Sequence, residues 1–262
     1  MRLAVAATAP FGADVLERLA ERHDVTALVT RPDRPAGRGR SVTAPPAKVA
    51  AERLGIPVLQ PERPTAALEL GDVVVVAAYG LLIPEELLAH GLWLNVHPSL
   101  LPRWRGAAPV ERAIMAGDTE TGVTIHQTVK ELDAGPIAAQ RSFPIGAEDH
   151  AGAVFARAAA LAVELLDEVL PEPSFRPQPT EGVTYADKIT TADRQLDLGR
   201  PPHELVNQVR ALSPHIGARA ELHGRRVTIW RARVTDGRFQ PEEIQPEGGR
   251  RMAYEAWLRG LR

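Results

Sequence analysis

The chain has 262 residues, of which 44% are hydrophobic and 24% charged, so it can bury a substantial core and is neither disordered nor fibrous. It contains no cysteine, which excludes disulfide scaffolds, cysteine-ligated metal centres and thiol catalysis and favours a cytoplasmic location. The formal net charge is −2, but residues 201–262 hold 11 Arg and 7 acidic residues, a local charge of +4. This basic tail is either chance surface composition or a surface that approaches a polyanion.

The hydrophobic pattern predicts alternating strands and helices over the first 170 residues. Strands are expected at 2–7, 24–30, 56–59, 72–78, 93–97, 121–129 and 137–143, and helices at 13–23, 46–54, 108–116 and 151–170. The wholly apolar run 73–76 is typical of a strand buried on both faces of a parallel sheet, and the apolar stretch 73–83 is too short to span a bilayer. The sequence therefore predicts an α/β domain with a mostly parallel sheet and no membrane association.

A proline-rich stretch separates this domain from a smaller one. Four prolines fall within nine residues, which excludes a helix and indicates a stiff connector: Pro171, Pro173, Pro177 and Pro179. Beyond it we expect a helix at 203–212 and short strands at 218–222, at 226–234 and near Ile244, around a turn at 223–224. The predicted organisation is a catalytic domain over 1–170, a linker over 171–200 and a small β-rich domain over 201–262.

The turn after the first strand argues against a nucleotide site. Residues 7–12 read Ala-Thr-Ala-Pro-Phe-Gly and contain no G-x-G-x-x-G motif. The chain also lacks the G-x-x-x-x-G-K-[ST] motif that cradles phosphates. Neither dinucleotide binding nor ATP or GTP hydrolysis is therefore predicted.

The chemically most informative segment is 95–106, Asn-Val-His-Pro-Ser-Leu-Leu-Pro-Arg-Trp-Arg-Gly. Asn95 and His97 are two residues apart on a predicted strand that Pro98 ends, so both side chains share one face at the carboxyl end, where α/β sheets bind ligands. An amide donor beside an imidazole suits the developing oxyanion of acyl transfer. Asp133, in a predicted turn, would fix the imidazole tautomer and stabilise the imidazolium.

These segments resemble the tetrahydrofolate-dependent formyltransferases. The resemblance is carried by the Asn-x-His strand end at 95–97, the Ser-Leu-Leu-Pro-x-x-Arg-Gly loop at 99–106 and the Asp-x-Gly turn at 133–135. Residues 32–39 (Pro-Asp-Arg-Pro-Ala-Gly-Arg-Gly) and 103–109 (Arg-Trp-Arg-Gly-Ala-Ala-Pro) narrow it to the methionyl-tRNA formyltransferases. The similarity runs over nearly the whole chain.

The resemblance implies a Rossmann-like formyltransferase domain followed by a C-terminal domain of OB type. It implies transfer of a formyl group from the co-substrate 10-formyltetrahydrofolate to the α-amino group of methionyl initiator tRNA, in translation initiation and without a metal. Asn95 and His97 would hold the oxyanion, and Asp133 would help to remove the proton of the ammonium group. We expect the enzyme to be a monomer.

The resemblance also implies two binding regions. The folate pterin is expected in a pocket formed largely by backbone over Tyr79, Gly80, Leu81, Leu82, Ile83 and Pro84. The tRNA is expected to contact Arg31, Arg34, Arg38, Arg40 and Trp104. Guanidinium groups on such a loop can follow phosphates, and salt would weaken that binding steeply.

Each candidate also has a purely structural interpretation. Asn95 and Asp133 fit turn formers, His97 fits a hydrogen-bonded buried histidine, and the arginine-rich loop fits a solvated segment. Trp104 would then only pack within its loop. His90 and His126 have no ligand spacing with other candidates and are expected to be structural or exposed.

Three features depart from the family pattern. Residues 7–9 read Ala-Thr-Ala, residues 133–136 read Asp-Ala-Gly-Pro, and the short region 201–262 puts closure of a five-stranded barrel in doubt. The short tail and the Asp-Ala-Gly-Pro turn leave open the N-formylation of a small amine, such as an amino sugar or a glycinamide nucleotide. A folate- or RNA-binding module without turnover is a further alternative.

Overall fold

The structure is a computed structural model that describes residues 1–36, 41–65 and 68–261. The chain divides into two compact units that interleave along the sequence. Unit 1 comprises Met1–Arg105, Gly122–Ser142 and Ala156–Thr184. Unit 2 comprises Gly106–Thr121, Phe143–Phe155 and Tyr185–Arg262.

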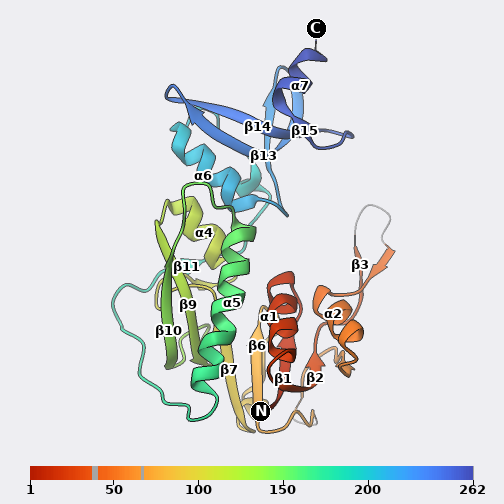
Figure 1. Ribbon diagram of the computed structural model, residues 1–262, viewed down its shortest axis with the longest axis vertical. Coiled ribbons are helices and arrows are strands. Elements are labelled where there is room, and N and C mark those ends of the chain that lie inside the picture. The colour runs from red at the N-terminus through yellow and green to blue at the C-terminus, as the bar shows by residue number, and fades with distance from the viewer. Residues whose placement is uncertain (37–40, 66–67, 262) are drawn as a thin grey trace. The chain divides into compact units, whose positions relative to one another are not determined.

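A seven-stranded sheet forms the scaffold on which the candidate site is built (Figure 1). Its order is β10-β9-β7-β6-β1-β2-β5. The strands are β1 (Arg2–Ala7), β2 (Asp24–Val29), β5 (Val58–Leu59), β6 (Val73–Ala77), β7 (Leu92–His97), β9 (Glu120–Gln127) and β10 (Ile137–Pro144). The five strands from β7 to β5 are parallel to their neighbours, whereas β9 runs antiparallel to β7. The predicted α/β class with a mostly parallel sheet is confirmed.

The helices of the first 170 residues begin and end where the local sequence favours it. They are α1 (Pro10–Ala20), α2 (Pro46–Leu54), α3 (Glu85–Leu88), α4 (Pro109–Ala116) and α5 (Ala151–Val169). Proline occupies the first turn of α1, α2 and α4, where its missing N–H costs no hydrogen bond. Gly55 ends α2 in the left-handed conformation that a helix C-terminus commonly takes.

Helix α1 packs closely on β1 and β6 because Gly12 has no side chain. A Cβ at Gly12 would lie 2.3 Å from the Ala77 carbonyl oxygen, at the carboxyl end of β6. On this unit the buried cluster includes Ala4, Val74, Val76 and Trp93. The packing fixes the strand ends from which the site loops emerge.

Unit 2 contains a four-stranded antiparallel sheet in the order β12-β13-β14-β15. Its strands are β12 (Ala218–Leu222), β13 (Arg225–Thr235), β14 (Arg238–Pro246) and β15 (Met252–Ala253). The helices of this unit include α4, α6 (Pro202–Leu212), α7 (Tyr254–Arg259) and the short 3₁₀ helix at Ala192–Arg194. The turns 223–224 and 236–237 have positive φ at both residues, which joins neighbouring strands as tight hairpins. In the described residues this sheet is open, with β12 and β15 at its edges.

Several short elements were not predicted. They are the hairpin of β3 (Arg34–Ala36) and β4 (Ser41–Thr43), the pair β8 (Arg105–Gly106) and β11 (Tyr185–Ala186), and the elements α3, α7 and β15. The expected strand near Ile244 is longer than predicted, because β14 forms a full hairpin with β13. No helix in the described parts of the chain combines the length and apolar character needed to cross a membrane.

The predicted boundaries at 170 and 200 differ from the compact units. Residues 171–184 belong to unit 1 and are not a free connector, since Arg176 and Ile137 exchange both backbone hydrogen bonds at 2.7 and 2.9 Å. Helix α4 belongs to unit 2, because it packs against α6. The prolines therefore mark an extended segment that is hydrogen-bonded to β10 of the sheet.

Candidate active site

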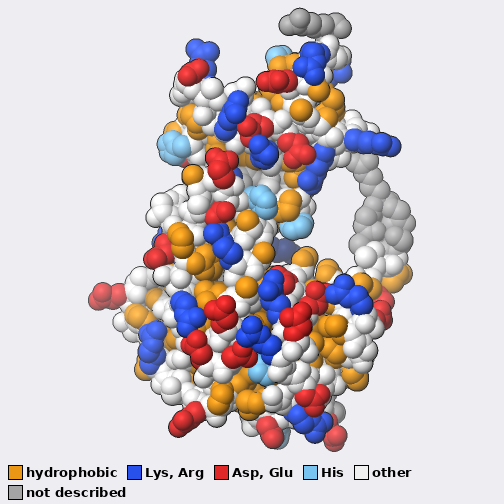
Figure 2. All heavy atoms as spheres, in the orientation of Figure 1, with side chains coloured by type: hydrophobic (Ala, Val, Ile, Leu, Met, Phe, Trp, Pro, Cys, Tyr) orange, Lys and Arg blue, Asp and Glu red, His pale blue; other side chains and the backbone are white. Residues whose placement is uncertain are grey.

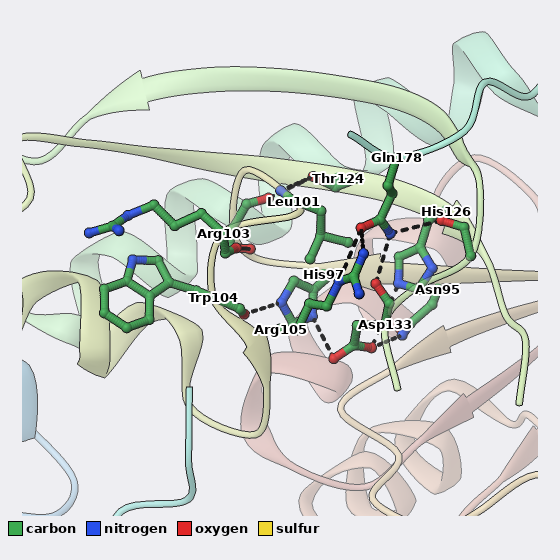
Figure 3. A network of polar contacts seen from close by, with 12 residues as sticks. Asn95, His97, Leu101, Arg103, Trp104, Arg105, Thr124, His126, Asp133 and Gln178 are labelled. Atoms are coloured by element: carbon green, nitrogen blue, oxygen red, sulfur yellow. Dashed lines mark hydrogen bonds and ion pairs between the residues drawn. The ribbon is translucent and has the colours of Figure 1, made fainter. Parts of the chain in front are cut away.

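Three side chains from two segments, the strand β7 and the turn that carries Asp133, meet at the carboxyl end of β7 (Figure 3). Asn95 Nδ2 donates a hydrogen bond to Asp133 Oδ1 at 3.1 Å. His97 Nδ1 lies 3.6 Å from Asp133 Oδ2. The structure thus brings together the three residues predicted to be catalytic, and their roles in the reaction stay a prediction.

The ring of His97 is held between two oxygen-bearing groups. Its Nε2 donates to the Trp104 carbonyl at 2.8 Å, while Nδ1 faces the Asp133 carboxylate. Both ring nitrogens therefore face oxygen atoms, which fixes the orientation of the ring. The side chains of His97 and Asp133 are 5% and 9% exposed, so the charges that form here are poorly screened by water.

The loop after β7 is held by polar contacts from β9 and β10. Thr124 Oγ1 donates to the Ser99 carbonyl at 2.7 Å and accepts from the Leu101 amide at 3.1 Å. Gln140 Nε2 donates to the Leu101 carbonyl at 2.9 Å. These bonds fix the path of the loop that delivers the Trp104 carbonyl to His97.

Trp104 itself has an unusual backbone with φ of 63°. Its amide donates to Thr184 Oγ1 at 2.8 Å, and the Arg103 guanidinium lies 4.4 Å from the centre of its indole ring. A cation above an aromatic face is an attractive contact. The structure therefore gives Trp104 a backbone role in holding His97, while its predicted contact with tRNA is untested.

His126, expected to be structural or exposed, is buried beside this cluster. Strand β9 lies beside β7 with His126 opposite Asn95, and His126 Nε2 lies 3.7 Å from Asp133 Oδ1. His126 is only 1% exposed. Its Nδ1 donates to the Gln127 carbonyl at 3.0 Å, whereas Nε2 is buried without a hydrogen-bond partner in the described residues.

The environment of His126 keeps its ring neutral. Burial, and after it the charge of His97, lowers the pKa of His126 to about 4, although Asp133 acts in the opposite direction. The alternating pattern Thr124-x-His126 on one strand is the sequence signal that could have revealed it. Gln178 is a second polar residue near Asp133 that sequence reasoning missed, since it lies in the proline-rich stretch.

The loop predicted to bind folate follows β6, the parallel neighbour of β7. Val76 pairs with Asn95, so this loop leaves the sheet next to the cluster of Asn95, His97 and Asp133. Tyr79 and Ile83 are buried and Leu82 is 81% exposed. Thr8 Oγ1 donates to the Tyr79 carbonyl at 2.7 Å, which ties the loop to the turn after β1. No described contact tests the folate role of residues 79–84.

The arginines predicted to bind tRNA have different positions. The Arg31 guanidinium donates to the Gly80 carbonyl and is thereby joined to the predicted folate loop. Arg34 is exposed on β3. Arg38 and Arg40 lie outside the described residues. Of these four arginines, the structure therefore presents only Arg34 as an exposed side chain on the hairpin.

The basic tail carries both signs of charge. Glu242 pairs with Arg231 at 2.9 Å and with Arg233 at 3.3 Å, and the Arg251 guanidinium lies 3.5 Å from the centre of the Trp230 ring. On the face drawn in Figure 2, acidic and basic side chains are intermixed over the described residues. Part of the positive charge of the tail is thus neutralised within unit 2.

Comparison with known proteins decides the family. The family model described as Formyl transferase matches residues 1–170, and the model described as Formyl transferase, C-terminal domain, matches residues 188–242. The chain belongs to the formyl transferase family. This formyltransferase is 46% identical over 245 residues to the methionyl-tRNA formyltransferase of Xanthomonas axonopodis pv. citri, an alignment that covers 87% of this chain and 80% of that protein.

Two solved structures share the fold of this formyltransferase. The methionyl-tRNA formyltransferase from Clostridium thermocellum has a TM-score of 0.66 at 15% identity, covering 94% of this chain and 98% of that one. The N-formyltransferase from Helicobacter canadensis, in complex with folinic acid and dTDP-3-aminofucose, has a TM-score of 0.69 at 18% identity, covering 96% and 98%. At these identities the likeness establishes the fold alone.

A hollow of about 570 Å³ lies beside the cluster of the formyltransferase. It is lined by Arg105, Ala134, Pro136 and five residues of the 177–183 segment. Its size is in the range of small-molecule sites. Among the described residues, no three His, Asp or Glu side chains are grouped so that they could hold a metal ion.

Proposed function

We propose that this chain transfers the formyl group of 10-formyltetrahydrofolate to the α-amino group of methionyl initiator tRNA. The observation that carries the proposal is the meeting of Asn95, His97 and Asp133 at one strand end of a formyltransferase domain. The 46% identity to a protein named methionyl-tRNA formyltransferase supports this acceptor over a small amine. The proposal places the enzyme in the cytoplasm, where it would act in translation initiation.

The chain's own residues suffice for the acyl transfer. An α-amino group has an ordinary pKa near ~8, so a useful neutral fraction exists at neutral pH without a strong base. As its nitrogen bonds to the formyl carbon, an oxyanion and an ammonium group develop. Asn95 gives one N–H to Asp133 and has a second to donate to the oxyanion, and the His97 ring, two residues further along the same strand, would help to hold the same negative charge.

Asp133 is placed to receive the proton of the ammonium group, directly or through a water molecule. Loss of that proton prevents the amine from leaving again when the oxyanion collapses. The bond from the formyl carbon to N10 of the folate then breaks, and N10 takes up a proton. Protons balance over the reaction, since the amine loses one and the folate gains one.

The folate role is argued from the loop after β6. Tyr79 and Ile83 give this loop an apolar base, and it leaves the sheet beside Asn95. A flat pterin ring would pack on such a surface and place N10 toward the cluster. When bound, the folate supplies the activated formyl group.

The test is a competition between acceptors. The protein is incubated with 10-formyltetrahydrofolate and equal amounts of methionyl initiator tRNA and an amino-sugar nucleotide, and the products are identified by mass spectrometry. Formylated methionyl-tRNA is expected, together with saturable tRNA binding that weakens steeply with salt. Formylation of the amino sugar alone would refute methionyl-tRNA as the acceptor but would still support formyl transfer. No transfer to either acceptor would refute enzymatic formylation.

A further inference from the structure

Gln178 is the one residue of 171–180 that is not exposed. Its amide is fully engaged (Figure 3): Nε2 donates to the carbonyls of Asp133 at 2.7 Å and Gly135 at 2.8 Å. Oε1 accepts from Arg105 Nε at 3.2 Å and from Arg105 Nη2 at 2.6 Å. Carbonyls only accept and guanidinium groups only donate, so these partners define the orientation of the amide.

The backbone that carries Gln178 is fixed on both sides. On one side, Arg176 exchanges two backbone hydrogen bonds with Ile137, the first residue of β10. On the other side, the Thr184 carbonyl accepts from the Arg105 amide at 2.9 Å. The side chain of Gln178 can therefore hold its hydrogen-bond partners in place, because the backbone that carries it has little freedom to move.

The flanking residues restrict Gln178 further. Pro177 and Pro179 have fixed φ angles, and a residue before proline is confined to extended backbone. The proline-rich composition, which first indicated a connector, therefore serves to present one glutamine in a defined direction.

The Asp133 turn needs such support. Asp133 has a φ of 48°, in the left-handed region that Asp tolerates better than most residues but that is still less favourable than ordinary backbone, so contacts that hold the turn stabilise it. The hydrogen bonds from Gln178 end on the carbonyl of Asp133 itself and on that of Gly135, two residues later. If they are lost, the turn can relax and the carboxylate can move away from Asn95 and His97.

We propose that Gln178 is a positioning residue for formyl transfer, which sets the place of the Asp133 carboxylate by holding the backbone of its turn. The role rests on the proposed function of the Asn95, His97 and Asp133 cluster. Arg105 completes the arrangement by fixing the oxygen end of the glutamine amide.

The decisive variant is Gln178→Glu. It keeps the length of the side chain and an oxygen for Arg105, but it cannot donate to the two carbonyls. We expect kcat for formyl transfer to fall on the order of 10- to 100-fold, as for other small displacements of reacting groups, with little change in KM for either substrate. Unchanged kcat would overturn the proposal.

A matched control is available in unit 2. Gln208 is buried, and its Nε2, like that of Gln178, donates to two carbonyls, those of Asp193 at 2.8 Å and Gln195 at 2.9 Å. Gln208→Glu removes the same kind of bridge and should lower the melting temperature similarly while leaving kcat unchanged. Equal losses of kcat in the two variants would mean that the effect of Gln178 is a general loss of stability.

Two readouts separate positioning from a structural role. In the Asp133→Asn background, Gln178→Glu should reduce the single-turnover rate by no more than about twofold, because the group it positions is gone. Amide hydrogen exchange over residues 131–136 should be faster in Gln178→Glu and unchanged in Gln208→Glu. The exchange measurement needs no acceptor, so it tests the positioning even if the wild-type protein formylates no tRNA; unchanged exchange would refute it.

Discussion

Replacing the buried His126 should flatten the pH dependence of the free energy of unfolding, by an amount that follows from the shift in its pKa. Because burial lowers its pKa from the ordinary 6.5 to about 4, the unfolded chain binds a proton at this residue throughout that interval and the folded protein does not. The free energy of unfolding must therefore rise with pH between those two values. The interval corresponds to a contribution of about 3 kcal/mol, which is complete above pH 6.5 and is lost as the pH falls to about 4.

The variant His126→Asn tests this reasoning. An asparagine amide can still donate to the Gln127 carbonyl, as the ring Nδ1 does, but it does not titrate. Urea unfolding at a series of pH values should show that the wild-type protein loses about 3 kcal/mol more than the variant over the interval. His90→Asn, at an exposed position, is the control and should follow the wild-type curve. Parallel curves for wild type and His126→Asn would show that the ring is not held neutral by burial.

Four further changes test other parts of the site and fold. Asn95→Ala should lower kcat by roughly 10²–10³, the cost of one lost oxyanion donor, and unchanged single-turnover rates would remove Asn95 from the mechanism. Gly135→Ala would place a Cβ 1.8 Å from the Gln127 carbonyl oxygen, so it should displace the Asp133 turn and lower kcat by about 10², which steady-state kinetics would detect. Arg31→Ala removes the contact with Gly80 and should raise KM for the folate about tenfold without altering the salt dependence of tRNA binding; the opposite pattern would restore Arg31 to the tRNA surface. Burial raises the pKa of Glu111 from 4.5 to about 6, so the contribution of this residue to the free energy of unfolding is lost as pH rises through that range. Glu111→Gln should remove this loss, which amounts to up to about 2 kcal/mol, as measured by urea unfolding at a series of pH values.

The elements with strong hydrophobic periodicity were predictable from the sequence. The bounds expected for 2–7, 46–54 and 218–222 coincide with β1, α2 and β12. Strand β14 was recognised only near Ile244, because Pro241 and two glutamates interrupt its apolar pattern. The pair β8 and β11 consists of two residues each, and such pairing depends on contacts between distant segments.

The candidate site was predictable only where one strand carries it. Asn95 and His97 follow from alternation along β7, and Asp133 was named from the turn that carries it. His126 was missed because its proximity depends on β9 lying antiparallel beside β7, which sequence spacing does not reveal. Gln178 was missed because proline content indicates stiffness and contains no information about what the stiff segment contacts.

All the side chains of the reacting cluster come from unit 1. The C-terminal sheet can therefore change in sequence without replacing any of these three side chains. Under the proposed function, a lineage could diverge in its second unit while the same asparagine, histidine and aspartate remain available for the transfer.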